Sequence, residues 1–255
     1  MWFALVVSGW LAAAVQLDVP ALTVGPPATI AEIDATAWKG EAHRLAWSPD
    51  GSQLYVQLVA GSPPSGRRQH LLVDVPDGAR RELDTEPDWA QQYWAMKQDI
   101  HAPGDPSLAI EVEQRSEIRR AGPGPSGVLD RSGSPDALTS GPSPDNLAAG
   151  QHGDQRVRVV RLSFAGREIA SWINVARPVP GLVFSWGPEG SGALVYATEK
   201  GTLVVLNRKK RNKTLPGASN AMLPAWSTDG RRLAWLQRDA KYRYAVVWTR
   251  MSATY

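Results

Sequence analysis

Residues 44–56 read Arg-Leu-Ala-Trp-Ser-Pro-Asp-Gly-Ser-Gln-Leu-Tyr-Val, and residues 223–235 read Leu-Pro-Ala-Trp-Ser-Thr-Asp-Gly-Arg-Arg-Leu-Ala-Trp. The two stretches match almost position by position, and Leu-Val-Phe-Ser-Trp-Gly-Pro-Glu-Gly at 182–190 is a third copy with a longer turn. A segment that recurs at a fixed spacing indicates a repeated structural unit. Because Trp186 and Trp226 are 40 residues apart, the unit is predicted to be about this long.

Each copy predicts a strand, a tight turn and a second strand. Apolar residues alternate up to the tryptophan, and an acidic residue followed by glycine then reverses the chain, since glycine tolerates a positive φ. We interpret the acidic residues as acceptors of local backbone hydrogen bonds rather than as a ring of carboxylates that binds a metal. The predicted structural residues of the repeat turns are Trp47, Asp50, Gly51, Trp186, Glu189, Gly190, Trp226, Asp229 and Gly230.

The repeats predict an all-β fold, a β-propeller of about four four-stranded blades. After the 182–196 copy, further strands are expected at 202–206 and near 214–215. Pro87-Asp88-Trp89 lies 42 residues after Trp47 and is expected to open a degenerate blade whose second strand is 108–118. A four-stranded unit has two apolar faces, so neighbouring units must stack on it. A single propeller domain is therefore predicted over residues 17–255.

One blade contains an insertion. Residues 119–155 include 17 Gly, Pro or Ser among 37 residues. Such a composition buries too little apolar surface to offset the entropy of ordering, so a disordered loop is predicted. The alternating stretch 156–164 resumes the sheet.

The final blade has three recognisable strands between residues 223 and 250, and its fourth is missing. We predict that residues 28–35, near the N-terminus, supply this strand and close the ring.

The Trp-Ser-Pro-Asp-Gly turns, followed by Leu-Tyr-Val or Leu-Ala-Trp, resemble the TolB-type, WD-like β-propeller repeats of bacterial exported proteins. The resemblance covers roughly residues 40–80 and 156–250. It implies a periplasmic interaction scaffold or the propeller half of a larger enzyme such as a prolyl-oligopeptidase-like peptidase. The count of about four blades departs from the six that are typical of that family.

The N-terminus predicts export. Residues 1–15 are apolar and uncharged, and Ala12-Ala13-Ala14 fits a signal-peptidase site. A signal peptide at 1–14, cleaved near Ala14, predicts a periplasmic or secreted protein without a stable transmembrane span after cleavage. An uncleaved anchor and a mis-assigned start codon are the alternatives.

Composition and motifs provide little evidence for catalysis. A net charge of +3 with scattered basic residues argues against nucleic acid as a partner, and the absence of cysteine excludes thiolate chemistry. No Gly-x-Ser-x-Gly motif is present, and His43, His70, His101 and His152 lack zinc-motif spacing. The basic run 208–213 is interpreted as a solvated hairpin tip. We therefore predict no catalytic, cofactor-binding or metal-binding residues.

Two functions remain open, and a third possibility is a decaying fragment of a larger propeller with no function of its own. The first is a non-catalytic exported scaffold that binds a protein, a cell-envelope component or another macromolecule through its loops. The alternative is a propeller-type enzyme, a lyase, lactonase or glycan hydrolase, with its site at the channel mouth.

Overall fold

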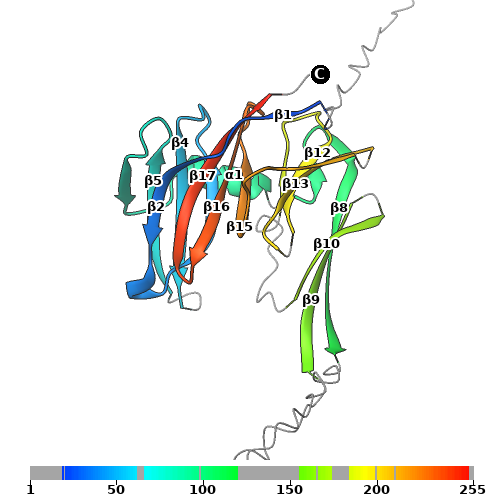
Figure 1. Cartoon of the computed structure of the whole chain (residues 1–255), viewed down its shortest axis with the longest axis horizontal. Helices are drawn as coiled ribbons and strands as arrows, with labels where there is room; N and C mark the ends of the chain where they lie inside the picture. Colours follow the sequence, from blue (N-terminus) through cyan, green and yellow to red (C-terminus); the bar gives the residue numbers. More distant parts are fainter. Residues whose placement is uncertain are drawn as a thin grey trace, which may run out of the picture.

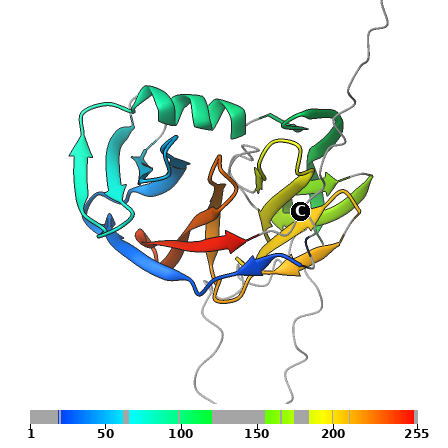
Figure 2. The same cartoon turned by 90° about the horizontal axis from the view of Figure 1, so that it is seen from above.

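A computed structural model describes residues 19, 21–61, 66–97, 99–119, 155–164, 166–173, 184–198, 200–209 and 211–252. These residues form four small antiparallel sheets arranged as a four-bladed propeller, which confirms the predicted fold class (Figures 1 and 2). The predicted signal peptide lies outside the described residues. So does nearly all of the predicted disordered loop, so its disorder stays a prediction.

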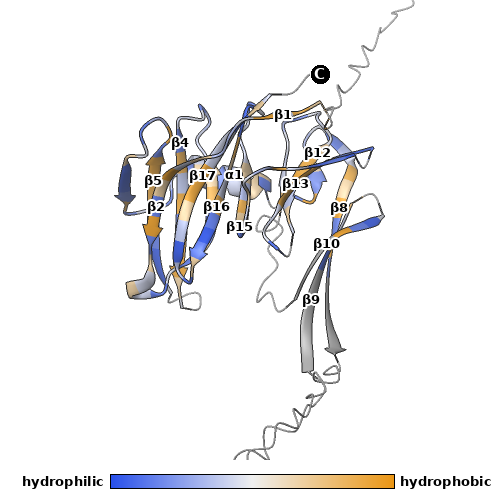
Figure 3. Ribbon diagram, viewed as in Figure 1, coloured by the Kyte–Doolittle hydropathy of each residue, from blue (hydrophilic) through white to orange (hydrophobic). Residues whose placement is uncertain are grey.

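Blades 1 and 3 each follow the chain from strand to neighbouring strand. Blade 1 consists of β3 (Glu41–Trp47), β4 (Gln53–Ala60), β5 (Arg67–Asp74) and β6 (Arg80–Leu83), and blade 3 of β11 (Phe184–Trp186), β12 (Ala193–Ala197), β13 (Leu203–Asn207) and β14 (Asn212–Thr214). Strands β12 and β13 are buried along their whole length. Hydrophobic residues dominate the strand labelled β13 in Figure 3. The sheets therefore pack face to face around the ring.

Blade 4 is completed by the N-terminal segment, as predicted. It contains β15 (Ala221–Trp226), β16 (Arg232–Ala240) and β17 (Arg243–Ser252), and β17 pairs antiparallel with β2 (Ala28–Asp34) and with β1 (Thr23–Val24). In this register Ile33 lies opposite Tyr244, and both side chains are buried. A one-turn 3-10 helix, Thr36–Trp38, leads from β2 into blade 1. Segments from the two ends of the described chain thus join in one sheet.

Blade 2 departs from the repeat. Its sheet contains β7 (His101–Ala102), β8 (Asp105–Arg119), β9 (Gln155–Phe164) and β10 (Arg167–Ile173). Strands β8 and β9 pair with each other, so the insertion connects two strands of one blade, as predicted. The β8–β9 hairpin extends away from the ring (Figure 1). The innermost strand, β7, has only two residues.

Pro87-Asp88-Trp89 was expected to open this blade, but a helix begins there, so that expectation was wrong. The second strand expected at 108–118 is confirmed, since it lies within β8. Helix α1 (Asp88–Lys97) begins beside a proline, has an acidic residue in its first turn and a lysine in its last. All three features favour a helix. Its buried residues Ala90, Tyr93, Trp94 and Lys97 have i, i+3, i+4, i+7 spacing, which puts them on one face. That face packs against β3 of blade 1 and β15 of blade 4. Along the chain, α1 connects blade 1 to blade 2 (Figure 2).

Tryptophans pack between successive blades. The Trp47 indole nitrogen donates to the Ala225 carbonyl of blade 4 (2.9 Å), and Trp186 donates to the Asp99 carbonyl beside blade 2 (3.0 Å). Trp89 of α1 packs edge-on against Tyr55 of blade 1, with ring centroids 6.3 Å apart. Trp89 therefore packs against a neighbouring blade even though it lies on a helix.

Candidate functional site

The first hairpin turns of the four blades meet at one end of the ring. The Thr228 hydroxyl of blade 4 donates to the Pro49 carbonyl of blade 1 (3.5 Å). A side chain at Gly230 would come within 2.7 Å of Pro188 in blade 3. The Gly190 amide donates to the Pro103 carbonyl of blade 2 (3.1 Å). We call this surface, made by residues 48–52, 103–104, 187–192 and 227–231, the turn end.

The acidic residues of two repeat turns bind their own turns. In blade 1 an Asp50 carboxylate oxygen accepts from the Ser48 hydroxyl (2.6 Å) and the Ser52 amide (3.0 Å). These bonds, that from Ser48 first, lower the pKa of Asp50 to about 2. In blade 4 Asp229 accepts in the same way from Ser227 (2.5 Å) and the Arg231 amide (2.9 Å). Burial would raise the pKa of Asp229, but these bonds outweigh it and lower the pKa.

The third acidic turn residue, Glu189, is different. Its longer turn is closed by backbone bonds from Gly187 to Ala193 and from Ser191 to Pro188, and no described group donates to its carboxylate. Gly51, Gly190 and Gly230 all have φ near +70°, a conformation that favours glycine. Glu189 is thus available at the turn end, whereas Asp50 and Asp229 are engaged locally.

A pocket of about 190 Å³ opens at the turn end, between α1 and the turns that follow β11 and β15. Its wall is largely aromatic and apolar. The lining residues include Tyr93, Met96, Lys97, Trp186, Glu189 and Trp226. The Tyr93 hydroxyl donates to the Trp226 carbonyl (2.7 Å), which anchors the helix to β15 at the pocket wall. Burial raises the pKa of Tyr93, so this residue is a neutral donor.

Lys97 is a buried cation in the pocket wall. Its side chain is 3% exposed, and its amine donates to the Pro224 carbonyl and lies 5.7 Å from the centroid of the Trp94 ring. Burial lowers the pKa of this amine from 10.5 to about 7. Among the described residues no carboxylate lies within ion-pair distance of it. A buried amine of this kind is a functional-site candidate, because burial of an unpaired charge is costly.

A chain of polar side chains crosses blade 1 on the face near α1. His43 bonds the Gln57 amide oxygen (2.9 Å), the Gln57 amide nitrogen donates to the Tyr55 hydroxyl (3.2 Å), and that hydroxyl bonds His70 (2.6 Å). Burial is the main reason why the pKa of each histidine is lowered. Arg44 contacts both carboxylate oxygens of Glu86 at 2.7 Å. The two histidines therefore belong to a hydrogen-bonded network inside the blade.

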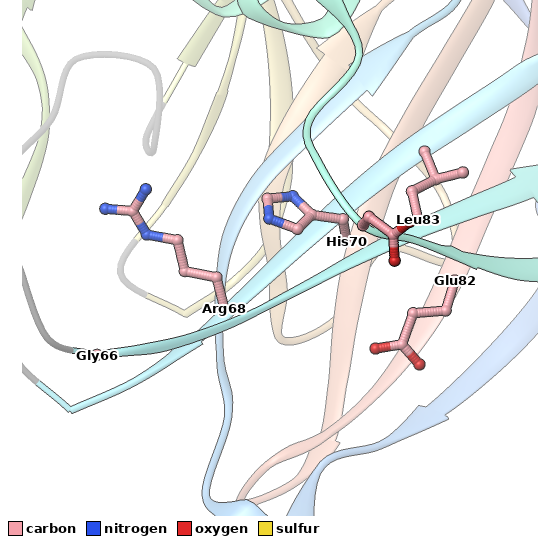
Figure 4. Close-up of a pocket in the computed structure, with 6 residues that line it drawn as sticks. Gly66, Arg68, His70, Glu82 and Leu83 are labelled. Atoms are coloured by element: carbon pink, nitrogen blue, oxygen red, sulfur yellow. The ribbon is translucent and has the colours of Figure 1, made fainter.

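The far end of this network reaches an open groove of about 550 Å³ at the outer edge of blade 1 (Figure 4). His70 lies between Arg68 on one side and Glu82 and Leu83 on the other. The residues lining the groove include charges of both signs. The groove is suited to polar surface contacts.

The remaining sequence candidates are spread over the surface. The described part of the basic run lies in the turn between β13 and β14 and at the start of β14, and Arg208 pairs with Asp105 of blade 2 (3.0 Å). His101 pairs with Asp99 (3.0 Å) on the exposed segment after α1, and His152 lies outside the described residues. In the part of the chain that the structure describes, no three His, Asp or Glu residues are placed to hold a metal. No helix described here has the length and apolarity needed to cross a bilayer.

Sequence reasoning did not identify Tyr93 and Lys97. Trp89 lies at the repeat spacing and was expected to open a blade, and no helix was predicted after it. The helical spacing of Ala90, Tyr93, Trp94 and Lys97 was the available signal. That spacing places a lysine on the buried face of the helix, which is an unusual position for a charged residue.

Comparison with known proteins does not establish a family. The chain matches no protein-family model and no curated protein. Among solved structures it is similar to Sqt1 from Chaetomium thermophilum, with 12% sequence identity and a TM-score of 0.23. That match covers 86% of this chain and 45% of the Sqt1 chain, so this chain spans less than half of its length. The propeller assignment therefore depends on the four sheets themselves.

Proposed function

We propose that this protein is a non-catalytic, exported scaffold of the TolB-like type that binds a protein partner at the turn end. The observation that carries the proposal is the position of two hydrophobic residues. Met96 and Ile100 are 46% and 40% exposed, and they are the large hydrophobic residues exposed in the described parts of the chain. Met96 lines the pocket, and Ile100 follows Asp99, whose carbonyl accepts from Trp186.

Several features at the turn end support binding there. Single exposed hydrophobic residues are ordinary on protein surfaces, but a pair beside an aromatic pocket is the arrangement that protein interfaces use. The turns that surround the pocket are held by a rigid ring of sheets, which lowers the entropic cost of binding. The apolar segment 1–15 supports export to the cell envelope.

The test is a comparison of surface variants in binding assays with a bacterial envelope fraction. An Ile100→Asp substitution should abolish binding of the partners that the full chain retains, because it replaces an exposed hydrophobic residue with a charge. Arg81→Glu, on the exposed outer strand of blade 1, is the matched control and should retain them. Equal retention by all three chains would refute binding at the turn end. A chain that lacks residues 120–154 reports whether the insertion contributes separately.

The enzymatic alternative has one observation in its favour, the lowered pKa of Lys97. A buried amine that is neutral near pH 7 can condense with an aldehyde, forming an imine and releasing water. Treatment with acetaldehyde and cyanoborohydride, followed by peptide mass mapping, compares Lys97 with the exposed Lys209. The scaffold proposal expects no faster labelling of Lys97, and selective labelling would favour amine chemistry.

A further inference from the structure

The pocket at Lys97 has the size of a single side chain. A volume of about 190 Å³ corresponds to roughly six water molecules at about 30 Å³ each. Pockets that enclose drug-sized ligands and cofactors are usually larger, about 300–1,000 Å³. The pocket therefore suits one residue of a larger partner better than a free small molecule.

The chemistry of the pocket wall is that of an incomplete ion pair. The Lys97 ammonium has three donors, and in the described structure one of them has an acceptor, the Pro224 carbonyl. Buried charges in proteins are normally paired, because desolvation without a counter-charge is costly. Lys97 is one of the residues that line the pocket, so an acceptor that enters the pocket could complete the bonds of its amine.

No acidic group that the structure places nearby serves as that counter-charge. Glu189 lines the same pocket but makes no ion pair with Lys97. Glu86 is engaged by Arg44, which itself lies 5.2 Å from the centroid of the Trp94 ring that Lys97 faces. Asp99, two residues beyond the helix, binds His101. The other titratable group in the wall, Tyr93, is neutral and donates to a backbone carbonyl.

We propose that the pocket at Lys97 binds the carboxylate of an Asp or Glu side chain in a peptide segment of the partner. The inference rests on the proposed function, since the exposed Met96 and Ile100 would contact apolar residues that flank the acidic one. Charge complementarity selects the carboxylate, and the pocket volume selects a single side chain. Glu189 at the rim disfavours a second acidic residue beside the first.

The same arrangement makes binding depend on protons. Burial leaves Lys97 with a pKa of about 7, so at pH 8 much of the free protein has a neutral amine. A bound carboxylate favours the ammonium form and raises the pKa. Binding at pH 8 should therefore take up close to one proton per complex.

The experiment selects a random phage-displayed dodecapeptide library on the full chain, on a Lys97→Met variant and on the Ile100→Asp variant. We expect Asp or Glu to be enriched at one position among peptides selected on the full chain, and this enrichment to disappear with Lys97→Met. A matched Lys209→Met variant, altered at an exposed lysine, should retain it. Selection without acidic enrichment, or equal enrichment on Lys97→Met, would overturn the inference.

Calorimetry on the unaltered protein provides an independent readout if Lys97→Met does not fold. The best selected peptide should bind at least tenfold more tightly than its Glu→Gln or Asp→Asn counterpart. In two buffers of different ionisation enthalpy at pH 8, the heats should reveal proton uptake by the acidic peptide only. Equal affinities and no proton uptake would refute carboxylate recognition. If no peptide is selected, or if Ile100→Asp selects the same peptides, the proposed function fails as well.

Discussion

Replacing Lys97 with methionine should make the protein more stable at neutral pH and less stable at high pH. The folded chain lowers the pKa of this amine from 10.5 to about 7 through burial. The unfolded chain therefore binds a proton that the folded chain gives up between these two pH values. Because the unfolded state binds more protons in this window, the stability of the wild-type protein rises as the pH increases from 7 to 10.5.

The magnitude follows from the two pKa values of Lys97. Each pKa unit corresponds to about 1.4 kcal/mol, so burial of the charged amine lowers the stability of the folded protein by at most about 5 kcal/mol below pH 7. This is an upper limit because the Trp94 ring partly stabilises the cation. Lys97→Met removes this cost but leaves the Pro224 carbonyl without its donor, which costs about 1–3 kcal/mol. Relative to the wild type, the free energy of unfolding of the variant should be about 2–4 kcal/mol higher at pH 6.5 and about 1–3 kcal/mol lower above pH 10.

Urea unfolding, followed by tryptophan fluorescence at pH 6.5, 8 and 9.5, measures the difference between the two chains. The advantage of Lys97→Met should shrink by about 1.4 kcal/mol for each pH unit above 7. Lys209→Met, at an exposed position, should show no such dependence. A stability difference for Lys97→Met that stays constant from pH 6.5 to 9.5 would refute the assignment of a buried, depressed amine.

Three further predictions concern the ring and blade 1. Ile33→Ala should lower the free energy of unfolding by about 2–5 kcal/mol, because it leaves a cavity at a buried site on the closing strand β2. The control Thr29→Ala, at an exposed position on the same strand, should change the free energy of unfolding by less than about 0.5 kcal/mol. Equal effects of the two substitutions in denaturant titrations would argue against closure of the ring by β2. Trp47→Phe should lower the free energy of unfolding by at least about 1–3 kcal/mol, because the Ala225 carbonyl loses its donor. A thermal unfolding midpoint equal to that of the wild type would exclude this contact. Burial lowers the pKa of His43 below its ordinary value of 6.5, so the unfolded chain binds protons more readily and stability should decrease as the pH falls below 6.5. His43→Gln should reduce that acid sensitivity, and an unaltered pH profile in urea titrations would contradict it.

The fold was predictable from the sequence because its signals are local and repeated. The Trp-x-x-acidic-Gly turns mark where each first hairpin reverses, and alternating apolar residues identify the strands on both sides. The count of strands in the last blade showed that one was missing, and residues 28–34 now pair with β17 at that position. This long-range pairing could be predicted because an open sheet edge is unfavourable and one unassigned β-rich segment remained.

The helix and its lysine were not predicted, and the reason is a conflict between two patterns. Trp89 lies at the repeat spacing, which favours a strand, whereas Ala90, Tyr93, Trp94 and Lys97 follow the helical period. In blade 2 the helix supplies the aromatic contact to blade 1 that a repeat strand would supply elsewhere. Both patterns bury the tryptophan, so burial could not distinguish them.

Local periodicity in the chain was thus sufficient for the all-β class, the repeat turns, most of the strands and the position of the insertion. The candidate site depends on contacts between residues far apart in the chain. Lys97 acquires its depressed pKa only in the folded chain, where α1 docks on β15 and the amine is buried with a bond to the Pro224 carbonyl. Desolvation is a property of the assembled ring and has no signature in a window of sequence.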